Sequence, residues 1–114
     1  MTVSERLEIV SFSEWKDRWW GGKRAARNLD GKLLDDGRRT AAFNDAGTVF
    51  HWECPNCGEP HVARLGETPI SGWENPQWVL SGPPERPSLH PSLGCGFCWP
   101  VGHYWLRDGQ MVLA

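Results

Sequence analysis

The chain has 114 residues, the size of one small domain, and a core this small is commonly reinforced by a metal or a disulfide. Its formal net charge of -2, from 12 Lys and Arg against 14 Asp and Glu, gives no bulk attraction to nucleic acid or to an acidic membrane. No apolar stretch approaches the roughly 18 residues that span a bilayer, and the first residues lack the apolar centre of a secretory signal. We therefore expect a soluble, cytoplasmic protein, in which cysteines are metal ligands more often than disulfides.

The composition changes near residue 47. Residues 1–46 hold 9 of the 12 basic residues, whereas residues 47–114 hold all the Cys, His and Pro. We predict an N-terminal helical, charged segment over residues 1–46 and a zinc-binding β-rich domain over residues 47–114. In the first segment, Ser13 is suited to cap a short helix, Glu14 favours its first turn, and Gly21 and Gly22 would end it.

The second segment has the pattern of short strands. Residues 48–52, 61–65, 78–80, 103–106 and 110–113 are rich in β-branched and aromatic side chains, and turn-forming residues separate them. Arg107, Asp108 and Gly109 suit a tight hairpin turn. Between residues 82 and 92 the sequence GPPERPSLHPS has too many prolines for a central strand, so we expect it at a sheet edge or on the surface.

Two Cys-x-x-Cys pairs predict a metal site. Cys54 and Cys57 lie in a CPNCG turn, and Cys95 and Cys98 repeat the spacing after a gap of 37 residues. Four thiolates from two such turns are the usual ligand set of structural Zn²⁺. The expected fold is β-rich α+β, a small zinc-ribbon-like antiparallel sheet with a short N-terminal helical segment.

Other ligand sets and chemistries compete with this assignment. A rubredoxin-like iron site uses the same four thiolates. A redox dithiol normally opens a helix within a βαβ unit, and that helical pattern is missing here. Either His61 or His103 could replace one cysteine, which would give a site of three cysteines and one histidine.

The sequence contains no familiar catalytic motif. P-loop, GxGxxG, HExxH and GxSxG patterns are all missing. His51 and His90 have no neighbouring Ser, Asp or Glu at a spacing that suggests a triad, although triads are recognised in space. A closed four-ligand metal site leaves no position for substrate. We therefore predict that the protein is not an enzyme.

The second half of the chain, with CPNCGEPH, then WVLSG and ERPSLHPSL, then GHYWLRDGQMVL, resembles a family of small zinc-finger-like proteins of unknown function encoded in phages and prophages. Its members often carry the label ammonia monooxygenase, which we do not transfer because such an enzyme needs membrane spans. Where that family has Cys before His, this chain has Gly102 before His103, so the resemblance implies His103 as an alternative ligand. The most specific matching positions are Cys54, Cys57, His61, residues 86–88, Pro91, Ser92, His103, Asp108 and Gly109.

The resemblance implies an accessory protein in the host cytoplasm, or one associated with the virion, that binds a host factor or another virion component. We expect its partner to be a protein, contacted through Trp19, Trp20, Lys23 and Arg24. The alternative is nucleic-acid binding, because residues 15–27 combine five basic residues with three Trp.

Overall fold

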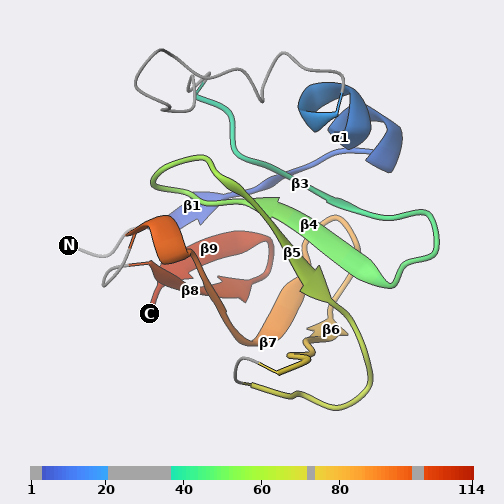
Figure 1. Ribbon diagram of the computed structural model, residues 1–114, viewed down its shortest axis with the longest axis vertical. Helices are drawn as coiled ribbons and strands as arrows, with labels where there is room; N and C mark the ends of the chain where they lie inside the picture. Colours follow the sequence, from blue (N-terminus) through green and yellow to red (C-terminus); the bar gives the residue numbers. More distant parts are fainter. Residues whose placement is uncertain (1–3, 21–36, 72–73, 99–101) are drawn as a thin grey trace.

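The computed structural model of the protein describes residues 4–20, 37–71, 74–98 and 102–114. Within these ranges the chain forms nine β-strands, one α-helix and one turn of 3-10 helix (Figure 1). The predicted β-rich α+β class with a short N-terminal helix is confirmed. The elements in chain order are β1 (Ser4–Arg6), β2 (Glu8–Ile9), α1 (Phe12–Trp19), β3 (Thr40–Phe43), β4 (Val49–Glu53), β5 (Pro60–Arg64), β6 (Val79–Ser81), β7 (Ser88–Gly94), η1 (Gly96–Cys98), β8 (His103–Arg107) and β9 (Gln110–Leu113).

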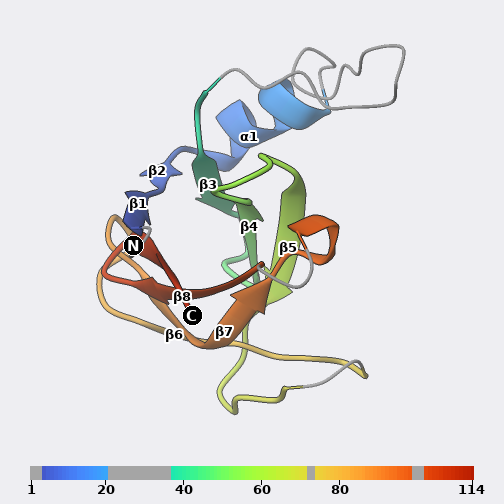
Figure 2. The ribbon, with the colours of Figure 1, turned by 90° about the vertical axis from the view of Figure 1, so that its left-hand side faces the viewer.

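The strands form two facing sheets where the sequence suggested one small sheet (Figure 2). Among the described strands, one sheet has the order β1-β9-β8-β7-β6 and the other has the order β2-β3-β4-β5. Strands β2 and β3 run parallel, and the other pairs are antiparallel. Apolar side chains from both inner faces fill the main core, including Phe50, Trp52, Ala63, Leu93, Leu106 and Met111.

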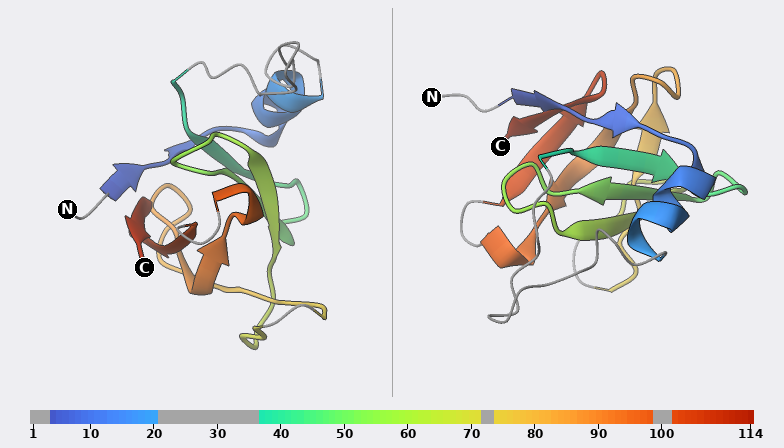
Figure 3. Two further views of the ribbon diagram at one scale, coloured as in Figure 1. Left: turned by 60° about the vertical axis from the view of Figure 1, so that its left-hand side comes forward. Right: turned by 90° about the horizontal axis from the view of Figure 1, so that it is seen from above.

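The N-cap of the predicted helix lies two residues earlier than expected. Ser11 is the N-cap residue, and its hydroxyl accepts a hydrogen bond from the Glu14 N–H at 3.1 Å. This satisfies one of the free N–H groups of the first turn, which is the role we had assigned to Ser13. The helix packs on the outer face of the β2-β3-β4-β5 sheet, away from β7, β8 and β9 (Figure 3).

A buried carboxylate joins the helix to that sheet. Glu53, at the end of β4, is fully buried and accepts hydrogen bonds from Arg18 Nε at 2.7 Å and from Trp19 Nε1 at 3.0 Å. The Thr40 hydroxyl donates to the same carboxylate from β3. Because a buried charge is costly without partners, these donors fix α1 against the strands.

Residues 1–46 also supply strands, which the sequence did not predict. Strand β1 pairs with β9, and β3 pairs with β4. Between β1 and β2, buried Leu7 donates its N–H to the Gly109 carbonyl at 3.0 Å as the chain crosses from one sheet to the other. The two segments on either side of residue 47 therefore share both sheets.

The proline-rich segment contains a central strand, so the expectation of an edge or surface position is wrong. Strand β7 lies between β6 and β8. Its pairing with β8 contains a β-bulge: Leu89 is opposite Leu106, and Leu93 is opposite Tyr104. An advance of four residues along β7 therefore corresponds to an advance of only two along β8. Pro91 lies in this bulge, where a missing N–H interrupts no regular ladder.

Candidate functional site

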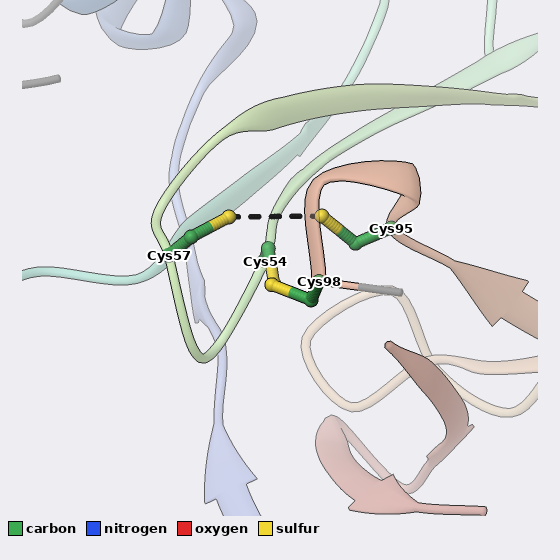
Figure 4. Close-up of side chains that lie close together, drawn as sticks. All are labelled: Cys54, Cys57, Cys95 and Cys98. Carbon is green, nitrogen blue, oxygen red and sulfur yellow. Dashed lines mark hydrogen bonds between the residues drawn. The ribbon is translucent and has the colours of Figure 1, made fainter. Parts of the chain in front are cut away.

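The four cysteines converge at one end of the two sheets. Cys54 and Cys57 come from the β4–β5 turn, and Cys95 and Cys98 come from the β7–β8 connection (Figure 4). All four sulfur atoms lie within 4.8 Å of one another, with Cys54–Cys98 at 3.7 Å and Cys57–Cys95 at 3.6 Å. Four sulfur ligands at the usual zinc–sulfur bond length would be about 3.8 Å apart in a tetrahedron, so the spacing fits a bound metal ion.

Backbone and side-chain contacts hold the first cysteine turn in shape. Gly58 has a φ of 78°, a conformation that glycine adopts without a Cβ penalty, and its N–H donates to the Cys54 carbonyl at 2.9 Å. Buried Arg39 donates to the Pro55 carbonyl at 2.9 Å and to the Asn56 carbonyl at 3.3 Å. The turn is therefore braced from β3, independently of the thiols.

The environment of the cluster opposes ionisation of two of the thiols, Cys57 and Cys95. Burial raises the pKa of Cys57 to about 11, and burial together with the charge of Cys54 raises the pKa of Cys95 above its usual value. For Cys98 burial acts in the same direction, but hydrogen bonds from Asn56 and the other cysteines lower its pKa overall. Because thiolates are the ligand form, metal binding would displace protons that the buried site otherwise retains.

Neither histidine proposed as an alternative ligand belongs to this cluster. The group of residues that could hold a metal, searched over the described chain, contains the four cysteines alone. The His103 imidazole lies over the neighbouring strand, where a Cβ built on Gly94 would be 3.2 Å from its Nε2. His61 stacks against Trp52 with ring centroids 4.5 Å apart. Both histidines instead line a cavity beside the cluster.

This cavity has a volume of about 1040 Å³ and is lined by residues of both sheets and of α1. Its walls are rich in Trp, and they carry two serines, Ser71 and Ser92. Three of the four histidines in the sequence, His51, His61 and His103, also line it. Sequence separation had hidden this grouping, because the serines and histidines come from different strands and loops.

Ser92 lines the cavity from β7, the strand that pairs with β8 and its His103. It is half-buried on β7, directly after the bulge residue Pro91, and its carbonyl accepts a hydrogen bond from Trp78 Nε1 at 3.2 Å. Two residues further on, Gly94 pairs with His103 of β8. Bulges often redirect a side chain next to a functional site. No hydrogen bond joins Ser92 Oγ to an imidazole within the described ranges.

Two buried polar atoms on the same wall have no hydrogen-bond partner among the described residues, Trp52 Nε1 and His61 Nε2. Trp52 is 1% exposed, so solvent does not replace the missing partner. Burial lowers the pKa of His61, against the opposing effect of the nearby Glu59 charge. His61 is therefore favoured in its neutral form, in which one ring nitrogen accepts a hydrogen bond.

The predicted partner-binding residues are placed differently from one another. Trp20 is 66% exposed, as expected, but Trp19 is 7% exposed and bonded to Glu53, so the expectation that both are displayed is wrong. Lys23 and Arg24 lie outside the described residues. The partner-binding role of this set, and the nucleic-acid alternative, stay predictions. No helix in the described parts of the chain is long and apolar enough to cross a membrane.

A family model described as "Bacterial ubiquitination-like system serine protease (BubE)" matches residues 26–114, which are 89 of the 114 residues. Searches of curated proteins and of solved structures find no significant match. The matched region includes the four cysteines, Ser92 and all four histidines.

This match corrects the prediction that the protein is not an enzyme, because the matched family is named for a serine protease. The prediction rested on motifs of residues close together in sequence, whereas catalytic groups of a protease are recognised by their arrangement in space. Ser92 had been noted as a family-like position without a role, and His103 as an alternative metal ligand. The chain belongs to the BubE family of bacterial ubiquitination-like system serine proteases.

Proposed function

We propose that the protein is a serine protease acting in a bacterial ubiquitination-like system, with Ser92 as its nucleophile and His103 as its general base. The observation that carries this proposal is that Ser92, His61 and His103 line the same cavity. The protein partner expected from the sequence is then the polypeptide substrate. The phage or prophage setting inferred from the resemblance stays a prediction.

The other serines have positions or contacts less suited to catalysis. Ser11 caps the helix, and the Ser88 hydroxyl accepts a hydrogen bond from the Asp108 N–H at 2.8 Å. Ser71 lines the cavity but is exposed in a loop. Ser92 alone combines a cavity position with a strand next to one that carries histidine, within the described residues.

The chemistry follows from these groups. His103 accepts the Ser92 Oγ proton as Oγ attacks the substrate carbonyl carbon, and it then gives that proton to the leaving amine as the C–N bond breaks. Water, deprotonated by the same imidazole, next hydrolyses the acyl–serine ester and restores the Ser92 hydroxyl. No Asp or Glu lies among the described residues of the cavity wall, so His61 is the nearest equivalent of a third member.

The cysteine cluster has a structural role in this proposal. Four cysteines complete a tetrahedral Zn²⁺ site and leave no open position, so the ion would stabilise the fold without contacting substrate. Zinc is our choice over iron because it is the usual ion of structural sites formed by two Cys-x-x-Cys turns. The cluster also anchors both hairpins that carry Ser92, His61 and His103.

A fluorophosphonate probe, which bonds to an activated serine Oγ with loss of fluoride, tests the nucleophile. We expect the intact protein to be labelled at Ser92, with complete loss in Ser92→Ala and retention in Ser81→Ala, a matched serine on β6. His103→Gln should slow labelling by about 10²-fold or more, in line with the loss of a general base. Labelling that survives Ser92→Ala and disappears in Ser71→Ala would move the nucleophile to Ser71.

A second assay tests proteolysis directly. The intact protein is incubated with a tryptic digest of a bacterial cell extract, and new peptide ends are identified by mass spectrometry. New ends that require Ser92 support the proposal. A chain that is neither labelled nor able to cleave any peptide contradicts it.

A further inference from the structure

Strand β5 forms the free edge of its sheet beside the cavity, where it leaves main-chain groups available. The Cys54 N–H donates to the Glu59 carbonyl, and the Leu65 N–H donates to the Thr48 carbonyl, both at 2.9 Å. In an antiparallel pair the bonding direction alternates, so His61 and Ala63 bond toward β4. The N–H and C=O of Val62 therefore point outward.

The open part of this edge is short and well defined. At one end the Arg64 carbonyl accepts a hydrogen bond from the Trp78 N–H at 2.9 Å. At the other end Pro60 has no N–H to offer. Val62, whose side chain is 64% exposed, lies between them, and its N–H and C=O have no partner among the described residues.

The cavity extends to both faces of this edge. Val62 is opposite His51 on the face covered by the helix, whereas His61 is opposite Trp52 on the inner face. Residues of both pairs line the cavity, together with exposed Trp20 on the outer side. A ligand bound along β5 would therefore contact apolar walls on both faces, as the alternate side chains of an extended peptide do.

The inner wall also has unused hydrogen-bonding capacity. Trp52 Nε1 and His61 Nε2 are buried without partners among the described residues. Buried polar atoms are normally paired, so these two point to a ligand with its own donors and acceptors. A polypeptide main chain offers both kinds of group at every residue other than proline.

We infer that the substrate binds as an extended segment added to the free edge of β5, paired with the main chain of Val62. This inference rests on the proposed function for the reaction, and it adds the form in which substrate is recognised. Main-chain pairing aligns the segment along the edge beside the cavity that Ser92 and His103 line, with alternate carbonyl groups pointing away from β5. The substrate must therefore present an unfolded, strand-like segment, and a folded loop or helix is excluded.

Val62→Pro tests the pairing because it removes the outward N–H without removing a hydrogen bond to β4. Val62→Ala is the matched control, since it shortens the side chain and keeps the N–H. With the tryptic peptide mixture as substrate, we expect Val62→Pro to cleave about tenfold more slowly than Val62→Ala, the size expected for one lost hydrogen bond. Fluorophosphonate labelling, metal content and melting temperature of the two variants should agree closely.

Equal cleavage by the two variants would overturn strand addition, as would a parallel loss of labelling in Val62→Pro. Retention of the same peptides on immobilised Ser92→Ala protein, with and without Val62→Pro, separates this inference from the proposed function. If the intact protein neither labels nor cleaves but retains peptides through Val62, the protease proposal fails and strand addition stands. If no peptide is retained, strand addition is wrong.

Discussion

The cysteine cluster and the neighbouring cavity share the β4–β5 and β7–β8 hairpins, but they differ in whether their polar atoms have neighbours to interact with. In the cluster every sulfur atom lies within 4.8 Å of the other three, and braced backbone supports the first turn. In the cavity, Trp52 Nε1 and His61 Nε2 are buried without a partner among the described residues. The geometry of the first arrangement suits one metal ion, whereas the second offers unused hydrogen-bonding atoms to a molecule that enters from outside.

This difference predicts which substitutions affect stability and which affect activity. Polar groups that are hydrogen-bonded within the folded protein contribute to its stability, because removing one of them leaves its partner exposed or unpaired. Groups that lack a partner in the free protein contribute to binding, so their removal costs little folding free energy. Ser92→Ala should accordingly abolish labelling and leave the melting temperature unchanged.

The largest expected effect is loss of the metal. Cys57→Ser, or chelation of the intact protein, should unfold the chain, because a structural zinc site supplies about 10–16 kcal/mol, as much as a small domain's whole stability. Circular dichroism during chelation and elemental analysis of the purified protein check this. We expect about one zinc ion per chain. If the chelated protein melts at the same temperature, the cysteine cluster does not stabilise the fold through a bound metal.

The two adjacent tryptophans give the next contrast. Trp19→Ala should cost about 3–5 kcal/mol of unfolding free energy, because it opens a buried site and removes a donor from the Glu53 carboxylate. Trp20→Ala should change that free energy by about 1 kcal/mol or less, because the side chain is mostly exposed. Urea unfolding of both variants measures the difference. Equal losses of unfolding free energy in the two variants would show that the difference in exposure between Trp19 and Trp20 does not determine their contributions to stability.

Trp52→Phe probes an unpartnered group directly. The change loses some packing but also removes a buried N–H that has no partner among the described residues, so the net cost in unfolding free energy should be about 1 kcal/mol or less. Peptide cleavage should fall more than this small cost explains. Unchanged cleavage would mean that the indole N–H takes no part in substrate binding.

The smallest expected effect is a pH dependence from His51. Burial lowers its pKa below the ordinary value of 6.5, so the unfolded chain binds more protons at this position than the folded one. Its contribution to stability is therefore complete above about pH 6.5 and is lost as the pH falls. Melting temperatures measured between about pH 7.5 and about pH 5.5 should decline less steeply in His51→Phe. His90→Phe, at an exposed position on β7, is the control.

Local signals made the hairpins and the cysteine pairs predictable. A Cys-x-x-Cys turn, or a strand followed by Asp108 and Gly109, contains most of its own determinants within a few residues. The position of β7 was not predictable in this way. Its prolines argued against a central strand, and only the bulge between Leu89 and Leu93 allows that strand to pair on both sides.

The cavity depends on packing between distant segments. His61, Ser92 and His103 line it together only because the β4–β5 and β7–β8 hairpins come together, and no spacing rule in the sequence encodes that arrangement. The difference in exposure between the adjacent Trp19 and Trp20 side chains was also set by residues distant in the sequence. Trp19 is buried because Glu53, 34 residues away, receives its indole N–H.

Pairing of β1 with β9 also affects how the protein is made. Ser4 lies opposite Val112, so β1 has as its partner a strand that is synthesised about a hundred residues later. Until β9 is synthesised, β1 has an unpaired edge and the five-stranded sheet is incomplete. Contacts this distant in sequence form slowly. The sheet should therefore close only once β9 has been made, with a period before that in which the nascent chain needs protection from aggregation.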